Sequence, residues 1–152
     1  MAAADMFEIR LNGVGAHGAM PHQGVDPIIC GAALVQSLQS IVSRRVSPLS
    51  PAVVSVTIFE AGSAMNVIPG TARLAGTARS FSADVRAMLE ASIREIAETT
   101  ARTHGCGLEL DWITGYPPTV NHLAEADRAA TVAASVLGVD KIVTDIEPSM
   151  AS

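Results

Sequence analysis

The chain has 152 residues, of which 49% are apolar and 16% charged, and its formal net charge is −5. This size suits one compact domain, or one domain with part of another, and the apolar fraction excludes a disordered chain. The negative charge argues against nucleic acid as a partner, and no apolar run approaches the ~20 residues that cross a membrane.

The first half of the chain predicts a strand, a loop and a helix. The N-terminus has neither the basic residues nor the apolar run of a signal peptide, so we expect a cytoplasmic protein. Residues 7–12 alternate apolar and polar side chains, as in a strand with one buried face. A glycine-rich loop follows over 13–25. Asp26-Pro27 then begins a helix, because Asp caps helices well and Pro fits their first position. The apolar residues at helical spacing, which we expect to be buried, are Ile28, Ala32, Val35, Leu38 and Val42.

The second half predicts two strands, a second helix and a fourth strand. Residues 53–60 are rich in β-branched side chains, and residues 72–79 alternate in polarity. Ser82 is the expected N-cap of a helix that ends at Gly105, and a strand follows over 106–113. The apolar stripe of this helix comprises Val85, Met88, Leu89, Ile93 and Ile96. Four charges of alternating sign should lie on its exposed face: Arg86, Glu90, Arg94 and Glu98.

This order of elements predicts the fold. A β-α-β-β-α-β succession over residues 6–115 is typical of an α+β, ferredoxin-like sandwich, in which a four-stranded antiparallel sheet carries two helices on one face. The other face of the sheet should be covered or polar. Residues 116–152 predict a linker, a helix over about 123–137 and a short strand over 142–146. They carry too little apolar surface for a core of their own, so we expect them to be part of a second domain.

The cysteines and histidines limit the chemistry that this chain can carry out. Cys30 and Cys106 form no CxxC pair, which excludes a disulfide framework or a zinc knuckle and favours buried free thiols. His17 and His22 are too few to hold zinc, which needs three or four ligands, and the other two histidines lie far along the chain. Two interpretations stay open. The loop histidines are satisfied by backbone groups, or His17 donates a hydrogen bond to a ligand oxygen.

The glycine-rich loop, Asn66 and Arg79 can each be interpreted as structural or as functional. Residues 13–18 match G-x-G-x-x-G, but a dinucleotide site needs a helix to begin there, and Pro21 intervenes. Composition favours a turn role for Asn66. Arg79 ends the third predicted strand, where it is either solvated or a bidentate clamp for a carboxylate.

Several of these segments together resemble a known family. Gly15–Ile28, with the run Gly-Ala-His-Gly-Ala-Met-Pro-His, is similar to the start of the dimerisation (lid) domain of zinc-dependent amidohydrolases. These enzymes include hippurate hydrolase and N-acyl-amino-acid amidohydrolases, and they are related to aminoacylase and the carboxypeptidase-G2-type peptidases. Further segments agree in order and spacing: residues 43–45, 62–69, 76–79, 116–121 and, as the lead-in to a catalytic segment, 148–152.

The resemblance implies a role for each candidate residue. It implies that the parent protein cleaves the amide bond of an N-acyl amino acid with zinc or a similar divalent metal. It also implies that the domain forms a homodimer through its edge strands and caps the substrate. His17 would stabilise the oxyanion in the partner subunit's active site, and Asn66 and Arg79 would bind the substrate carbonyl or carboxylate. The family's metal-ligand motifs are absent from this sequence, so residues 116–152 would be a stub of catalytic domain, and we expect the chain alone to hold no metal and to be inactive.

Two other functions remain possible at this point. The chain could be a stand-alone ferredoxin-like module that binds a small ligand or regulates another protein. It could also be a purely structural dimerisation unit, although dimerisation by itself requires none of His17, Asn66 and Arg79.

Overall fold

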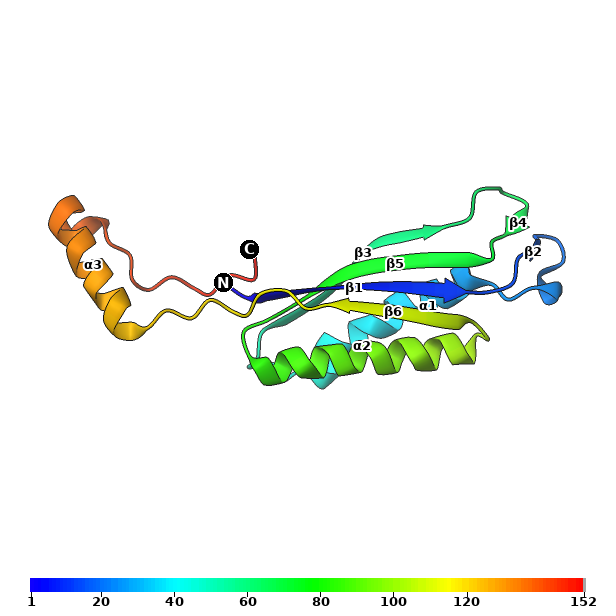
Figure 1. The fold of residues 1–152 in the computed structure, drawn as a ribbon, viewed down its shortest axis with the longest axis horizontal. Helices are drawn as coiled ribbons and strands as arrows, with labels where there is room; N and C mark the ends of the chain where they lie inside the picture. The colour runs from blue at the N-terminus through cyan, green and yellow to red at the C-terminus, as the bar shows by residue number, and fades with distance from the viewer. Residues whose placement is uncertain (152) are drawn as a thin grey trace.

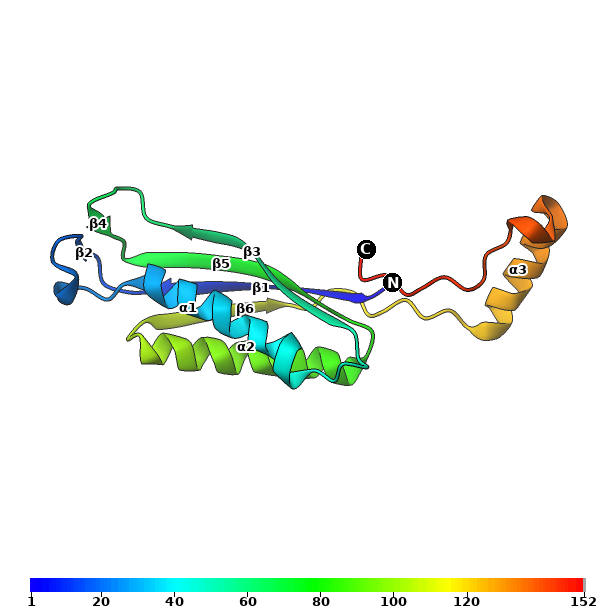
Figure 2. The same cartoon turned by 180° about the vertical axis from the view of Figure 1, so that it is seen from behind.

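An antiparallel sheet of four strands forms the body of the computed structural model, which describes residues 1–151 (Figure 1). The strands are β1 (Ala3–Asn12), β3 (Ala52–Ala61), β5 (Thr71–Ser80) and β6 (Gly107–Ile113). Their spatial order is β3-β5-β1-β6, so β3 and β6 are the edges. Helices α1 (Pro27–Ser40) and α2 (Ala83–Thr103) lie on the same face of this sheet (Figure 2). The predicted ferredoxin-like sandwich is therefore confirmed.

Helix α1 begins as predicted but buries a different face. The Asp26 carboxylate accepts a hydrogen bond from the backbone N–H of Ile28 at 2.8 Å, which confirms the N-cap. Of the stripe expected to be buried, however, only Leu38 is fully enclosed, and Ile28 and Val42 are 38% and 37% exposed. The residues that pack on the sheet are Cys30, Leu34, Leu38 and Ile41. The prediction was wrong because α1 is apolar over most of its circumference, so spacing alone could not select the inner face.

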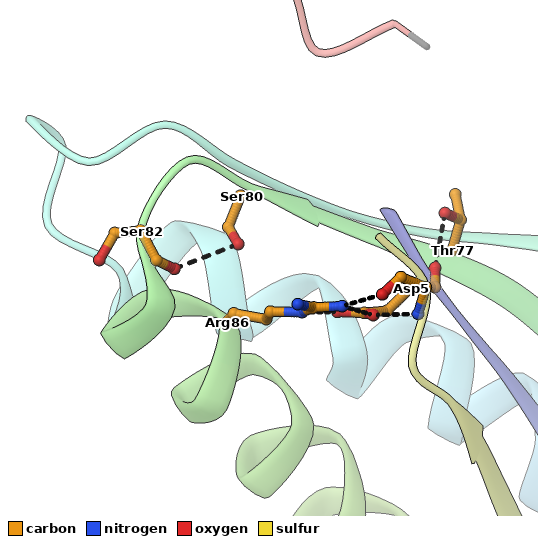
Figure 3. Close-up of polar contacts among 6 residues, drawn as sticks. Asp5, Thr77, Ser80, Ser82 and Arg86 are labelled. Atoms are coloured by element: carbon orange, nitrogen blue, oxygen red, sulfur yellow. Dashed lines mark hydrogen bonds and ion pairs between the residues drawn. The ribbon is translucent and has the colours of Figure 1, made fainter. Parts of the chain in front are cut away.

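Helix α2 agrees with its predicted stripe and differs at one charged residue. Leu89, Ile93 and Ile96 are buried, and Gly105, with φ +72°, ends the helix in a conformation that favours glycine. Glu90 and Arg94 form the expected surface ion pair at 2.8 Å. Arg86 does not lie on the exposed face, because its guanidinium turns inward to the carboxylate of Asp5 (Figure 3).

The sheet is buried on one side and polar on the other. Phe7, Ile9 and Leu11 of β1 point into the core beneath the helices. On the opposite face, Arg73 of β5 bridges Glu8 of β1 at 2.8 Å and Glu60 of β3 at 3.0 Å. The open face is thus stabilised by charge pairs across neighbouring strands.

Both cysteines are buried free thiols, as predicted. Burial, together with the neighbouring Cys106 thiol, raises the pKa of Cys30 to about 12. Both sulfurs are buried, whereas a reactive cysteine is exposed, and the raised pKa of Cys30 keeps that thiol protonated.

The loops at one end of the sheet form a small second sheet that the sequence did not predict. Strands β2 (Ala16–His17) and β4 (Val67–Ile68) pair antiparallel, with His17 opposite Val67. A short 3-10 turn, Pro21–Gln23, follows β2. We call this two-stranded unit, residues 13–25 with 62–70, the tip (Figure 1).

The C-terminal segment extends away from the sheet at the end opposite the tip (Figure 1). Helix α3 (Leu123–Leu137) is followed by a single turn, Val139–Lys141. The strand expected over 142–146 is wrong, because in the part of the chain that the structure describes these residues pair with no strand. The resemblance assigned to 148–152 includes Ser152, which lies outside the described residues. Within residues 1–151, no helix combines the length and apolar character needed to cross a membrane.

Candidate functional site

Two of the three candidate residues meet at the tip. The backbone N–H of Gly18 donates to the carbonyl oxygen of Asn66 at 2.7 Å, directly beside the pairing of His17 with Val67. The side chains of His17 and Asn66 are exposed. Residues that are far apart in the sequence are therefore backbone neighbours at the tip, and both side chains are open to solvent.

The ring of His17 has two different nitrogen environments. Nδ1 accepts a hydrogen bond from the backbone N–H of Ala19 at 3.1 Å. A nitrogen that accepts cannot carry the proton of a neutral imidazole, so the proton lies on Nε2. Within residues 1–151 no group hydrogen-bonds to Nε2, which leaves an N–H donor directed to solvent or ligand. His22, also exposed, makes no hydrogen bond inside the described chain.

The glycines of the tip permit close contacts between backbones. A Cβ at Gly13 would lie 2.2 Å from the carbonyl oxygen of Val25, and one at Gly24 would lie 2.6 Å from that of Val14. A Cβ at Gly18 would approach the Asn66 oxygen to 3.1 Å. The chain after Gly15 continues as a strand, so the glycine pattern closes a loop and does not open the helix that a dinucleotide site requires.

Arg79 lies at the other end of the sheet. It pairs in register with Ala4 of β1, eight residues along β5 from Thr71 at the tip end. Eight residues of strand span roughly 26 Å. Arg79 is half-buried and engaged in an interaction of its own. The three candidates therefore do not converge within one chain.

A shallow hollow of about 290 Å³ adjoins the tip. It is lined mainly by apolar or small residues from the start of α1 and the β3–β4 connection: Ile28, Ala61, Gly62, Ser63, Ala64, Met65 and Val67. Met65, next to Asn66, is fully exposed. The tip thus offers polar donors beside an apolar surface.

The described residues do not fit a metal centre. No three histidine, cysteine, aspartate or glutamate side chains gather in residues 1–151. His104 is engaged with the carbonyl oxygen of Thr100 at the end of α2, and His122 precedes α3, far from the tip. We therefore assign no metal ligand among residues 1–151.

Sequence patterns do not indicate the ion pair that lies at the end of the sheet opposite the tip. Asp5, 2% exposed, binds Arg86 through both carboxylate oxygens (Figure 3). Burial raises the pKa of Asp5, but the hydrogen bonds from Arg86 and Gly115 and the charges of Arg86 and Arg79 outweigh it and hold the pKa below its usual value. The partners are 81 residues apart, and no local pattern connects them.

Comparison with known proteins assigns most of the chain to one family. Residues 4–105 match the peptidase dimerisation domain family. The chain is 46% identical over 122 residues to an N-acyl-L-amino acid amidohydrolase of Geobacillus stearothermophilus, covering 80% of this chain and 33% of the relative. It is 34% identical over 152 residues to the hippurate hydrolase of Campylobacter jejuni, covering 100% of this chain and 40% of that relative.

A solved structure shows the same fold. A Bacillus subtilis protein described as a dinuclear metal-binding peptidase of the M20 family superposes with a TM-score of 0.70 at 30% identity. The match covers 98% of this chain and 36% of that one. The chain therefore spans about two fifths or less of the length of these matched proteins.

Proposed function

The chain belongs to the peptidase dimerisation domain family, and on that premise we propose that it is the dimerising and substrate-capping part of an amidohydrolase that cleaves N-acyl amino acids. The observation that carries this proposal is the tip, where backbone pairing brings the exposed residues His17 and Asn66 close together. A stand-alone regulatory module is not favoured, because the family match covers most of the sheet and both helices.

His17 is proposed to stabilise the oxyanion that forms when the amide carbonyl is attacked. Its Nε2 proton is held in place because Ala19 occupies Nδ1. A donor preorganised toward such an oxyanion contributes about 3–4 kcal/mol to transition-state stabilisation in other acyl-transfer sites. Asn66, exposed at the same tip, supplies a neutral amide suited to a substrate carbonyl or carboxylate.

Arg79 is proposed to bind the substrate carboxylate from a different subunit. The roughly 26 Å of β5 between the tip and Arg79 exceeds the length of a small N-acyl amino acid. One substrate can therefore contact all three residues only if His17 and Asn66 come from one copy and Arg79 from another. This separation supports the expectation that His17 acts in the partner's site.

The β3 edge is proposed as the seam of the homodimer. An unpaired edge strand is a template for pairing, and two copies related by a two-fold axis would join their sheets. Helix α1 packs over β3 and β5, and apolar side chains remain exposed along this border: Ile28, Ile29, Ile58, Phe59 and Met65. The β6 edge instead carries the exposed acids Glu109 and Asp111.

Subunit mixing tests the proposed roles. Residues 4–115 would replace the matched segment of the Geobacillus amidohydrolase. Two inactive forms would be made: His17→Ala, and a substitution of the glutamate that the family resemblance implies as the base in the catalytic segment of that enzyme. If His17 acts in trans, exchange of subunits restores about one active site in four, because each heterodimer pairs one intact tip with one intact catalytic domain.

The matched control is His22→Ala, which we expect to retain most activity. No recovery despite demonstrated subunit exchange would show that His17 acts within its own subunit or not at all. A His17→Ala chimera with full activity would refute the oxyanion role.

A further inference from the structure

A buried ion pair closes the end of the sheet opposite the tip. Arg86 Nε donates to Asp5 Oδ2 at 2.7 Å, and Arg86 Nη2 donates to Asp5 Oδ1 at 2.5 Å (Figure 3). Thr77 Oγ1 also donates to the backbone carbonyl of Asp5 at 2.9 Å. The ion pair ties the start of β1 to the first turn of α2, and the Thr77 hydrogen bond ties it to β5.

Gly115 is held by both members of the pair. Its N–H donates to Asp5 Oδ1 and its carbonyl oxygen accepts from Arg86 Nη2, each at 2.9 Å. A Cβ at this position would lie 1.9 Å from the carbonyl oxygen of Ala4, so only glycine allows this approach. We call the unit of Asp5, Arg86 and Gly115 the clasp.

The clasp lies where the C-terminal segment leaves the sheet. Regular pairing of β1 with β6 ends at Met6 and Ile113, and the clasp continues the connection beyond it. No side chain of residues 116–151 is buried, so side-chain packing contributes little to the direction of this segment. Its backbone bonds to the N-terminus are Tyr116 O with Ala4 N–H at 3.3 Å, Thr119 N–H with Met1 O at 3.0 Å and Ser149 O with Ala2 N–H at 3.1 Å.

The clasp is better suited to fixing the direction of the chain than to raising the free energy of unfolding. A buried ion pair gains little over apolar residues of the same volume, because desolvation offsets the attraction between the charges. A guanidinium that forks onto a carboxylate does restrict geometry, since two parallel bonds fix both distance and plane. We propose that Asp5 and Arg86 are positioning residues that fix the angle at which residues 116–151 leave the sheet.

The angle at the clasp affects the position of the tip, because the tip lies at the far end of the sheet. Strand β1 runs from Asp5 in the clasp to Asn12 beside the tip over roughly 23 Å, so a rotation of about 5° at the clasp moves the tip by roughly 2 Å. A misplacement of about 1 Å can lower a catalysed rate about a hundredfold. This consequence rests on the proposed role of His17, whereas the fixed angle itself does not.

Spin-label distances in the full 152-residue chain test the proposal without any catalytic assay. Nitroxide labels would be attached at Glu98→Cys on α2 and Val136→Cys on α3, both exposed, while the native cysteines are buried. Labelled chain would be mixed with an excess of unlabelled chain, so that the proposed homodimer adds no distances between copies. We then expect one narrow distance distribution in the parent chain. In Asp5→Asn and in Arg86→Gln, its width should at least double. Arg94→Gln removes a surface ion pair from the same helix and should leave the distribution unchanged.

Hydrogen exchange of Gly115 supplies a second measurement. Its amide should be protected in the parent chain and should exchange at least tenfold faster in Arg86→Gln, while core amides such as that of Ile93 keep their rates. A broad distribution or an unprotected Gly115 in the parent chain would overturn the proposal. It would also be overturned by variants that lose thermal stability without a wider distribution, or that do not fold, since the pair would then serve the core of the sheet.

Discussion

At the scale of single residues, the tautomer of His17 is open to direct measurement. The Ala19 N–H occupies Nδ1, so we expect the neutral ring to carry its proton on Nε2. In ¹⁵N-edited NMR spectra recorded where ordinary imidazoles are neutral, Nε2 should show a protonated, pyrrole-type shift and Nδ1 an unprotonated, pyridine-type shift. His22, which lacks a comparable bond, is the internal control and should show averaged shifts. A proton on Nδ1 of His17 would contradict the proposed oxyanion donor.

Asp5 predicts how stability depends on acid. Its folded-state pKa lies below the usual value of 3.8, so the carboxylate stabilises the fold fully above that value and loses its contribution as pH falls through the folded pKa. Denaturant titrations at a series of pH values should therefore show a steep loss of unfolding free energy below about pH 4. In Asp5→Asn this acid limb should be shallower, and stability at neutral pH should be lower.

A second carboxylate provides the control for that experiment. Arg73 lowers the pKa of Glu8 in the same direction by a hydrogen bond, but this pair lies on the open face of the sheet. About 1 M salt should remove the contribution of Glu8 and leave that of buried Asp5, because screening acts mainly on exposed charges. If Asp5→Asn left the acid limb unchanged at high salt, other carboxylates would account for it.

At the scale of elements, Gly76 in β5 leaves room for the ring of Phe7, its partner on β1. A Cβ on Gly76 would lie 2.1 Å from the carbonyl oxygen of Ser55 and 2.5 Å from the ring of Phe7. We expect Gly76→Ala to lower the free energy of unfolding by about 1–3 kcal/mol through overpacking. Gly70→Ala is the matched control, because its Cβ would meet only the Gly15 nitrogen at 3.9 Å. Equal denaturant midpoints for the two variants would contradict this assignment.

Local signals predicted the elements, and contacts between distant segments decided the rest. The caps Asp26 and Ser82 and the stripe of α2 depend only on nearby residues, and each was predicted correctly. The start of β1 was missed because the alanines at its beginning give no alternation, although they pair with β5. The inner face of α1 was missed because its choice depends on the sheet beneath it.

The candidate site also combines features that nearby residues predict with features that depend on distant segments. The residue types around His17 are enough to suggest a hydrogen-bonding role for its ring. The neighbourhood of His17 and Asn66 arises from two-residue strands that exist only because glycine backbones approach closely, and no periodicity predicts such contacts. The clasp joins Asp5 to Arg86, 81 residues further along the chain. In the sequence alone, Arg86 fits the pattern of exposed charges on its helix, and only the fold shows that Asp5 lies beside it.

At the scale of the whole molecule, the error in α1 is informative about assembly. The residues wrongly expected to be buried include Ile28 and Val42, which are apolar and partly exposed. Ile28 borders the end of β3, where Phe59 and Met65 are also uncovered. A second copy pairing through β3 would cover this border, so the apolar character of the outer face of α1 has an explanation in the dimer and none in the monomer.

We therefore expect the chain to form a homodimer in solution. Light scattering at high micromolar concentration should give twice the 15.7 kDa mass of one chain. Ile28→Glu, an acidic residue tolerated in the first turn of a helix, should shift the mass toward monomer without loss of helical signal. Ile113→Glu makes the same change on the exposed end of β6 and should leave the dimer intact. A monomer at every concentration would refute self-association of this chain, and dissociation by Ile113→Glu alone would place the seam on β6.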